Sequence, residues 1–190
     1  RRHATRFAPD GHPPLLFAPA GTRVPRRSAN AEKEADDLHS HDVQDDVMVI
    51  VRATRKLLQR LGPPIPQDQT STGLLGDWYA TYLPWRPRQV ALLVNERTLL
   101  PLLMPLAPAA TFLDRFPDEL SALLKAHLIP GSVIAVEVAA TRNARLATTA
   151  NRSLLGSMNE FAFLAEAHRA EGASTDLLEL SLTLASTPCS

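Results

Sequence analysis

The sequence predicts an α+β fold in which a small antiparallel sheet packs against several helices. Three observations support this prediction. Apolar runs of strand length lie between residues 48 and 104, and apolar residues at helical spacing dominate from residue 109 onward. The first 47 residues, by contrast, have almost no periodic apolar pattern. We therefore expect a single globular domain over residues 48–190, preceded by a disordered extension over residues 1–47.

The extension separates its charges, with arginines early and carboxylates late, and it holds four of the six histidines. It buries too little apolar surface to offset the entropy lost on ordering. His39, His41 and Asp42 form a weak metal signal, because a closed metal site needs three or four ligands held by a fold. We predict no metal site. The alternative that Met48 is the natural start, with upstream sequence before it, stays open.

The domain begins with a strand and a short helix. Met48–Ala53 is a β-branched apolar run that suits a buried strand. Thr54 follows as a potential N-cap, and leucines at helical spacing run from residue 57 until Gly62 ends the helix. Residues 62–73 are rich in proline and glycine and therefore indicate a loop.

Three further strands are expected at Trp78–Leu83, Gln89–Val94 and Thr98–Met104. The short polar connection at residues 95–97 predicts a hairpin between the last two. Pro101 has no N–H to donate to a neighbouring strand, so the third strand should lie at an edge or contain a bulge. A second copy of the chain that covers this apolar edge, giving a homodimer, is an alternative to blunting of the edge by Pro101.

The second half of the domain is mainly helical. We expect helices at Ala109–Phe116, at Pro117–Leu128 with the proline in its first turn, and from Asn151 or Ser153 to about Ala170. Residues 132–139 are compatible with a strand by composition, and Arg145–Thr149 with another short strand.

The segment Leu177–Ala185 fits both helix and strand. Its leucines alternate with polar residues, as in a strand, but leucine has a high helix propensity. Ser174, Thr175 and Asp176 immediately before it are typical helix-capping residues. We favour a helix.

The charge of the chain excludes a general basic field. The formal net charge is zero, and the domain itself has 13 basic and 12 acidic residues, so there is no strong nucleic-acid signature. A local patch remains compatible with these numbers. The apolar stretch from Leu99 to Leu113 contains three prolines and is shorter than the about 20 residues that span a membrane. We expect a soluble cytoplasmic protein without a membrane partner.

Two polar clusters are candidates for chemistry. In the first, Asp77, Glu96 and Arg97 meet if the strands pair as proposed. Asp77 and Glu96 are then weak candidates for acid–base or metal-binding carboxylates. The alternative is that Trp78 and Tyr79 pack in the core while residues 95–97 form a polar turn.

The second cluster is a helix start. Asn151, Arg152 and Ser153 combine free backbone N–H groups, the positive end of a helix dipole and a guanidinium, which together suit a phosphate or carboxylate. Asn159 further along is a candidate ligand-binding residue or a partner for a buried backbone group. Gly156 costs helix stability, so we expect it to be compensated by close backbone packing.

Four segments resemble a family of small bacterial proteins known only as a domain of unknown function. They are GDWYA (76–80), LLVNERTLLPLL (92–103), NRSLLGSMNEFAF (151–163) and LLELSLTLASTPC (177–189). The resemblance covers about residues 48–189, and it implies that the first 47 residues lie outside the common domain. It implies no activity, cofactor or catalytic residue.

Two functions follow. The first is a non-enzymatic regulatory or interaction module that binds an anionic small molecule or a protein partner. The alternative is an enzyme acting on a phosphorylated or nucleic-acid substrate, with Asp77 and Glu96 as carboxylates and Arg152 as the anion clamp. The sequence identifies neither a cofactor nor a substrate.

Overall fold

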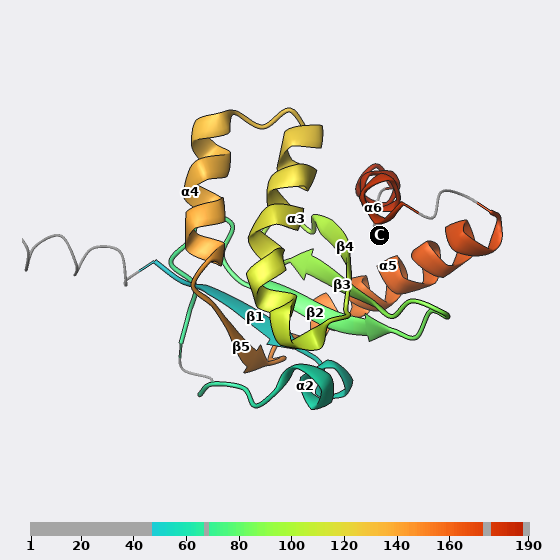
Figure 1. Cartoon of the computed structure of the whole chain (residues 1–190), viewed down its shortest axis with the longest axis horizontal. Helices are drawn as coiled ribbons and strands as arrows, with labels where there is room; N and C mark the ends of the chain where they lie inside the picture. The colour runs from blue at the N-terminus through green and yellow to red at the C-terminus, as the bar shows by residue number, and fades with distance from the viewer. Residues whose placement is uncertain (1–46, 67–68, 173–175, 188–190) are drawn as a thin grey trace, which may run out of the picture. The chain divides into compact units, whose positions relative to one another are not determined.

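Five strands form one mixed sheet in the order β4-β3-β2-β1-β5 (Figure 1). The computed structural model describes residues 47–66, 69–172 and 176–187. The strands are β1 (Val49–Ala53), β2 (Trp78–Leu83), β3 (Val90–Asn95), β4 (Pro101–Pro105) and β5 (Ala144–Thr148). The α+β class is confirmed, and so is the hairpin between β3 and β4. The expected disordered extension and the His39–His41 pair lie outside the described residues.

The sheet is antiparallel only in part. β2, β3 and β4 form an antiparallel meander, whereas β1 pairs in parallel with both β2 and β5. The reason is that β1 is joined to β2 by a long crossover, which includes helix α2 (Arg55–Leu61) and the proline-rich loop after it. A crossover of this length returns the chain to the same end of the sheet, as parallel pairing requires.

Helices cover both faces of the sheet and one of its edges. A short 3-10 turn at Ala109–Thr111 precedes α3 (Phe112–Ala126), and α4 (Gly131–Thr141) follows it as an antiparallel neighbour (Figure 1). The remaining helices are α5 (Arg152–Ala170) and α6 (Leu177–Ala185). The preference for a helix at Leu177–Ala185 is therefore confirmed. None of the described helices is long and apolar enough to cross a membrane.

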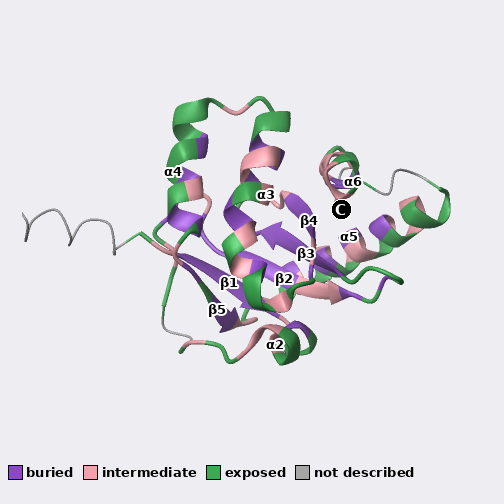
Figure 2. Cartoon of the chain, viewed as in Figure 1, coloured by how far each residue is buried: buried purple, intermediate pink, exposed green. Residues whose placement is uncertain are grey.

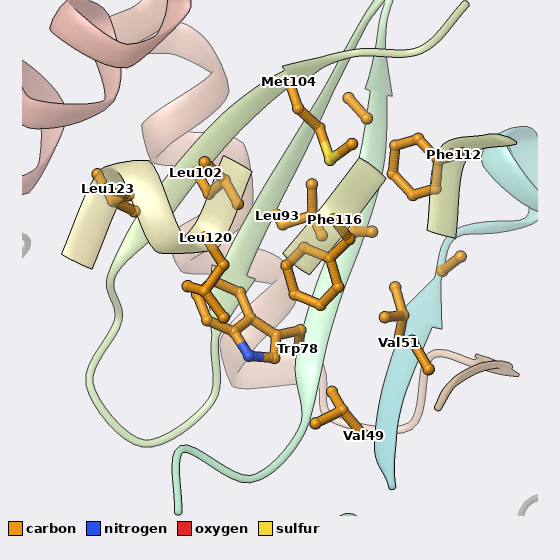
Figure 3. Close-up of a cluster of buried hydrophobic side chains, with 14 of the residues drawn as sticks. Val49, Val51, Trp78, Leu93, Leu102, Met104, Phe112, Phe116, Leu120 and Leu123 are labelled. Carbon is orange, nitrogen blue, oxygen red and sulfur yellow. The ribbon is translucent and has the colours of Figure 1, made fainter. Parts of the chain in front are cut away.

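Two apolar cores lie on the two faces. On one face, β1 to β4 pack against α3 and α4, and Trp78 meets Phe116 edge-on with ring centroids 5.5 Å apart (Figure 3). On the other face, Tyr79 and its neighbours pack against Met158 and Phe161 of α5. The alternation of side chains along β3, the central strand of the meander, sends successive residues to opposite cores, so every residue of β3 is buried (Figure 2).

The strand suggested for residues 132–139 is wrong, because this run forms most of α4. Apolar runs of this length fit a buried strand and a helix equally well, and Pro130 and Gly131 start the helix here. Pro117 also differs from expectation, since it lies inside the single helix α3 and does not begin a second one.

Thr54 stands at the N-cap of α2, as expected, although its side chain makes no hydrogen bond to the helix. The expectation of close packing at Gly156 in α5 is wrong. Gly156 lies on the exposed side of α5, and a Cβ built on it would meet nothing within 4 Å. No close packing compensates for this glycine.

The outer edge of β4 offers no free N–H group. The hydrogen bonds from Asn95 N to Leu100 O and from Leu106 N to Gln89 O turn the even-numbered residues of β4 toward β3. Residues 101, 103 and 105 therefore face outward. Two of them are prolines, and the N–H of Leu103 donates to Ser181 Oγ of α6 at 2.8 Å. Pro101 does lie on an edge strand, and the edge is closed within the chain itself.

Glu137 connects α4 to the loop before β2 through a hydrogen bond. The side chain of this residue is buried, and its Oε1 accepts a hydrogen bond from Leu75 N at 3.0 Å. Its Oε2 is buried and has no hydrogen-bond partner among the described residues. Burial raises the pKa of Glu137, and the backbone N–H groups of Leu75 and Leu74 oppose that shift. Desolvation thus favours the protonated carboxyl.

We predict that Glu137→Gln changes the pH dependence of stability. A raised pKa in the folded state means that Glu137 stabilises the fold below its ordinary pKa and loses this contribution as pH rises through the folded value. Glutamine does not titrate. Urea unfolding between acid and neutral pH should therefore show the variant gaining stability relative to the wild type as pH rises. A difference that stays constant or moves the other way would contradict this account.

Candidate functional site

The structure brings Asp77, Glu96 and Asn151 to the same end of the sheet. Asp77 immediately precedes β2 and Glu96 immediately follows β3, and these strands are paired with Trp78 opposite Asn95. The backbone N–H of Glu96 donates to Asp77 O at 3.0 Å. Asn151 comes from the loop before α5, and its Nδ2 donates to Glu96 Oε1 at 3.4 Å. The proximity of Asp77 and Glu96, expected from strand pairing, is present.

The Asp77 carboxylate is fully engaged by the protein itself. Its Oδ2 accepts from Arg52 Nε at 2.5 Å, and both side chains are buried. Its Oδ1 accepts from Ser71 Oγ at 2.6 Å and from Ser71 N at 3.1 Å. Arg52 makes a further bond, from Nη2 to Gln69 O at 3.1 Å. These contacts join β1, β2 and the segment before β2.

Asn95 organises the turn between β3 and β4, and the sequence analysis did not single it out. It is completely buried, and its Nδ2 donates to Leu75 O at 2.9 Å and to Asp77 O at 3.3 Å. Its Oδ1 accepts from Arg97 N, Thr98 N and Thr98 Oγ1. The sequence signal for this role was the asparagine in the polar tripeptide 95–97, because an asparagine side chain commonly forms hydrogen bonds with backbone groups two and three residues ahead.

Gly76 is required by the turn that leads into β2. Its φ is +72°, and a Cβ there would lie 2.8 Å from Arg97 Nε. Arg97 in turn donates from Nη1 to Leu74 O at 2.8 Å. The glycine therefore serves both the backbone conformation and the close approach of the guanidinium.

The N-terminus of α5 is capped by the side chain of Asn151. Asn151 Oδ1 accepts from Ser153 N at 3.0 Å and from Leu154 N at 3.3 Å. Arg152 and Ser153 are exposed beside it, and Asn159 is exposed about two turns further along the helix. The carboxylate of Glu96 accepts a hydrogen bond from the same capping side chain.

Tyr79 lies next to these polar groups, on the face of the sheet that packs against α5. Burial raises the pKa of the Tyr79 hydroxyl, the charges of Glu96 and Asp77 raise it further, and Arg52 and the Asn151 backbone oppose the shift. The hydroxyl is thus held neutral among the groups that fix α5 to the sheet.

A concentration of arginines lies elsewhere, around the loop between β2 and β3. Two cavities of about 370 and 790 Å³ adjoin this loop and share Trp85, Arg86, Pro87 and Gln89. The smaller is also lined by Arg88 and Arg169, and the larger by Arg60 and Tyr82. No acidic residue is among the described residues that line either cavity.

Two of these arginines stack on aromatic rings. The guanidinium of Arg60 lies 4.1 Å from the centre of the Tyr82 ring, and that of Arg169 lies 5.4 Å from Trp85. Arg169 also pairs with Glu166 one turn earlier on α5. We call the surface that combines these side chains the arginine cleft. It consists of Arg60, Tyr82, Trp85, Arg86, Arg88, Gln89 and Arg169.

Sequence reasoning missed the arginine cleft because charges were summed over the whole domain. The segment Trp85-Arg86-Pro87-Arg88 was the visible signal, since two arginines next to an aromatic residue are typical of anion-binding loops. Arg60 and Arg169 reach the loop from helices far away in the sequence. Only the fold places them there.

We predict a strong coupling between Arg52 and Asp77. Asp77→Ala leaves a buried guanidinium without its carboxylate and should lower the free energy of unfolding by about 3–5 kcal/mol. Adding Arg52→Met removes the stranded charge, so the double variant should lose less than the sum of the two single variants. Denaturant unfolding of all four proteins measures this, and strict additivity would show that the pair is not a coupled unit.

Comparison with known proteins gives a family but no relative of known activity. No curated protein and no solved structure matches the chain. The family model of a domain of unknown function, DUF6933, matches residues 50–190 and so includes every described strand and helix beyond the first residue of β1. The chain belongs to the DUF6933 family.

Proposed function

We propose that this protein is a non-enzymatic binding module of the bacterial cytoplasm whose arginine cleft takes a phosphate-bearing ligand. One observation carries the proposal: four arginines line two adjoining cavities, with no acidic residue among the described lining residues, on a domain whose total charge is nearly balanced. The domain at residues 48–190 is the unit to which we assign this function.

The chemistry of the cleft favours phosphate over other anions. A guanidinium presents a planar set of N–H donors that matches two phosphate oxygens at once. Stacking on Tyr82 and Trp85 restricts the planes of Arg60 and Arg169, so less side-chain entropy is lost when they bind. Arg86 and Arg88 are exposed on the loop between them.

The polar end of the sheet is better suited to a structural role. Both Asp77 oxygens are engaged, and Asn151 occupies the N–H groups of Ser153 and Leu154 that an anion would need. For this reason we place ligand binding at the arginine cleft and treat catalysis by Asp77 and Glu96, with Arg152 as clamp, as the less favoured hypothesis.

We expect the protein to bind tripolyphosphate, measured by calorimetric titration at low salt. Arg86→Gln and Arg88→Gln should each weaken binding, since losing one charge-assisted hydrogen bond costs about 1.5 kcal/mol, roughly tenfold in Kd. Arg142→Gln is the matched control, because Arg142 is an exposed arginine at the end of α4, outside both cavities. Equal losses in all three variants, or no binding by the wild type, would refute the proposal.

A second candidate function, self-association, is favoured by the surface of α4. Most residues of this helix are apolar, and part of its surface is exposed (Figure 2). Val133 and Val136 are 39% and 51% exposed. Leu128, in the connection before α4, is 89% exposed and lines an open groove of about 580 Å³ between α3 and α4. Largely apolar helices are normally buried, so we propose that a second copy covers this surface.

We expect the wild type to show a concentration-dependent mass above the monomer in size-exclusion chromatography with light scattering. Val136→Glu places a charge at the centre of the exposed face and should shift the protein to monomer. Phe163→Glu is the control, because Phe163 is 73% exposed on α5, away from α4. A wild type that remains monomeric over a wide concentration range would disprove self-association through this surface.

A further inference from the structure

We infer that the arginine cleft accommodates single-stranded nucleic acid, an inference that rests on the proposed phosphate-binding function. The two cavities flank the loop between β2 and β3. Tyr82, in the larger cavity, packs against the core beneath α3, whereas Val90 and Leu180, in the smaller one, belong to the core beneath α5. The cavities therefore open on different faces at this end of the sheet.

The positions of the arginines match a ligand with separated phosphates. Arg60 comes from α2, Arg86 and Arg88 from the loop, and Arg169 from the last turn of α5. The phosphates of a nucleoside triphosphate are bonded in immediate succession, so one cavity would take them all and the other would remain unused. Successive phosphates along a nucleic-acid strand are several ångströms apart and can engage both cavities.

The walls of the smaller cavity indicate a ligand with apolar faces as well as charge. Pro87, Pro105, Leu177 and Leu180 line it together with the arginines. Apolar walls suit the face of a base, and guanidinium planes also stack on bases. Inorganic polyphosphate has no group that would use these walls.

The nucleic acid must be single-stranded. To contact both cavities the ligand has to pass around the loop at the end of the sheet, and a duplex is too stiff to bend over so short a distance, with a persistence length of about 50 nm. A single strand bends freely. Among the described residues, Gln89 and Trp85 are the uncharged hydrogen-bonding side chains that both cavities share. With so few of them, we expect little base preference.

Because the charges of the domain nearly balance, the salt dependence of nucleic-acid binding is a sharp test of the contacts at the arginine cleft. Four arginines set an upper limit of about four neutralised phosphates, which for single strands gives a slope of log Kobs against log salt of roughly −2 to −3. Each lost arginine contact should reduce the magnitude of this slope by about 0.7.

The experiment is fluorescence anisotropy of a labelled oligothymidylate titrated with the full chain at several salt concentrations. We expect binding with the stated slope, a reduced slope for Arg86→Gln and for Arg88→Gln, and an unchanged slope for Arg142→Gln. A labelled duplex of equal length should bind more weakly. Circular dichroism of each variant shows whether it is folded, and only folded variants enter the comparison.

The outcomes separate this inference from the function on which it rests. Binding of tripolyphosphate without binding of the oligothymidylate overturns the inference and leaves the phosphate-binding function standing. Equal or tighter binding of the duplex overturns the inference as well. Binding of neither tripolyphosphate nor oligothymidylate overturns both.

Discussion

The buried pair of Arg52 and Asp77 is the interaction on which the central sheet depends. Parallel pairing of β1 with β2 requires the chain to cross over and re-enter the sheet beside β1, and Asp77 stands at that point of re-entry. Ser71 joins the pair to the returning segment, and its Oγ also accepts from Ile50 N at 2.7 Å. Thr72 Oγ1 accepts from Met48 N at 2.8 Å in the same way. At the start of β1, where β2 is not yet alongside, these two hydroxyls accept the hydrogen bonds of the β1 backbone N–H groups. The polar residues before β2 therefore complete the backbone hydrogen bonding of the sheet.

The sequence predicts those parts of the fold that local periodicity determines. Alternating or continuous apolar runs located the five strands to within three residues, and Asp176 before a leucine-rich segment favoured the helix α6. The run 132–139 could not be resolved in this way, because its assignment as a helix depends on α3 and the sheet already being in place beneath it. At the site, strand pairing predicted the approach of Asp77 to Glu96, but it gave no sign that Arg52 would occupy the Asp77 carboxylate. A charged residue in the middle of an apolar strand was the missed signal, since such a residue must find a buried partner.

Net charge is a property of composition, whereas binding depends on where charges lie. Of the 13 basic residues of the domain, four line the arginine cleft. One of the four, Arg169, is paired with Glu166, whereas several other acidic residues are used in other places. Asp77 is paired with Arg52, Asp176 caps α6, and Glu137 is buried under the loop before β2. Structural use of these carboxylates leaves the loop between β2 and β3 positive without any excess of basic residues in the sequence. A net charge near zero therefore argues against a general basic field, but it is compatible with a local basic patch.

The closed edge of β4 removes one of the surfaces through which copies of the chain could associate. Pro101 and Pro105 have no N–H, and Ser181 takes the N–H of Leu103, so another strand cannot be added through outward donors of β4. The other edge strand is β5, where Ile65 N donates to Leu146 O. Among the described helices, α4 has an apolar face turned to solvent. Its inner residues Glu137 and Ala140 lie beside Gly73, near the start of β1 and β2, whereas the arginine cleft follows the end of β2. Because the two surfaces lie at opposite ends of the sheet, a dimer formed through α4 leaves the arginine cleft of each copy open to its ligand.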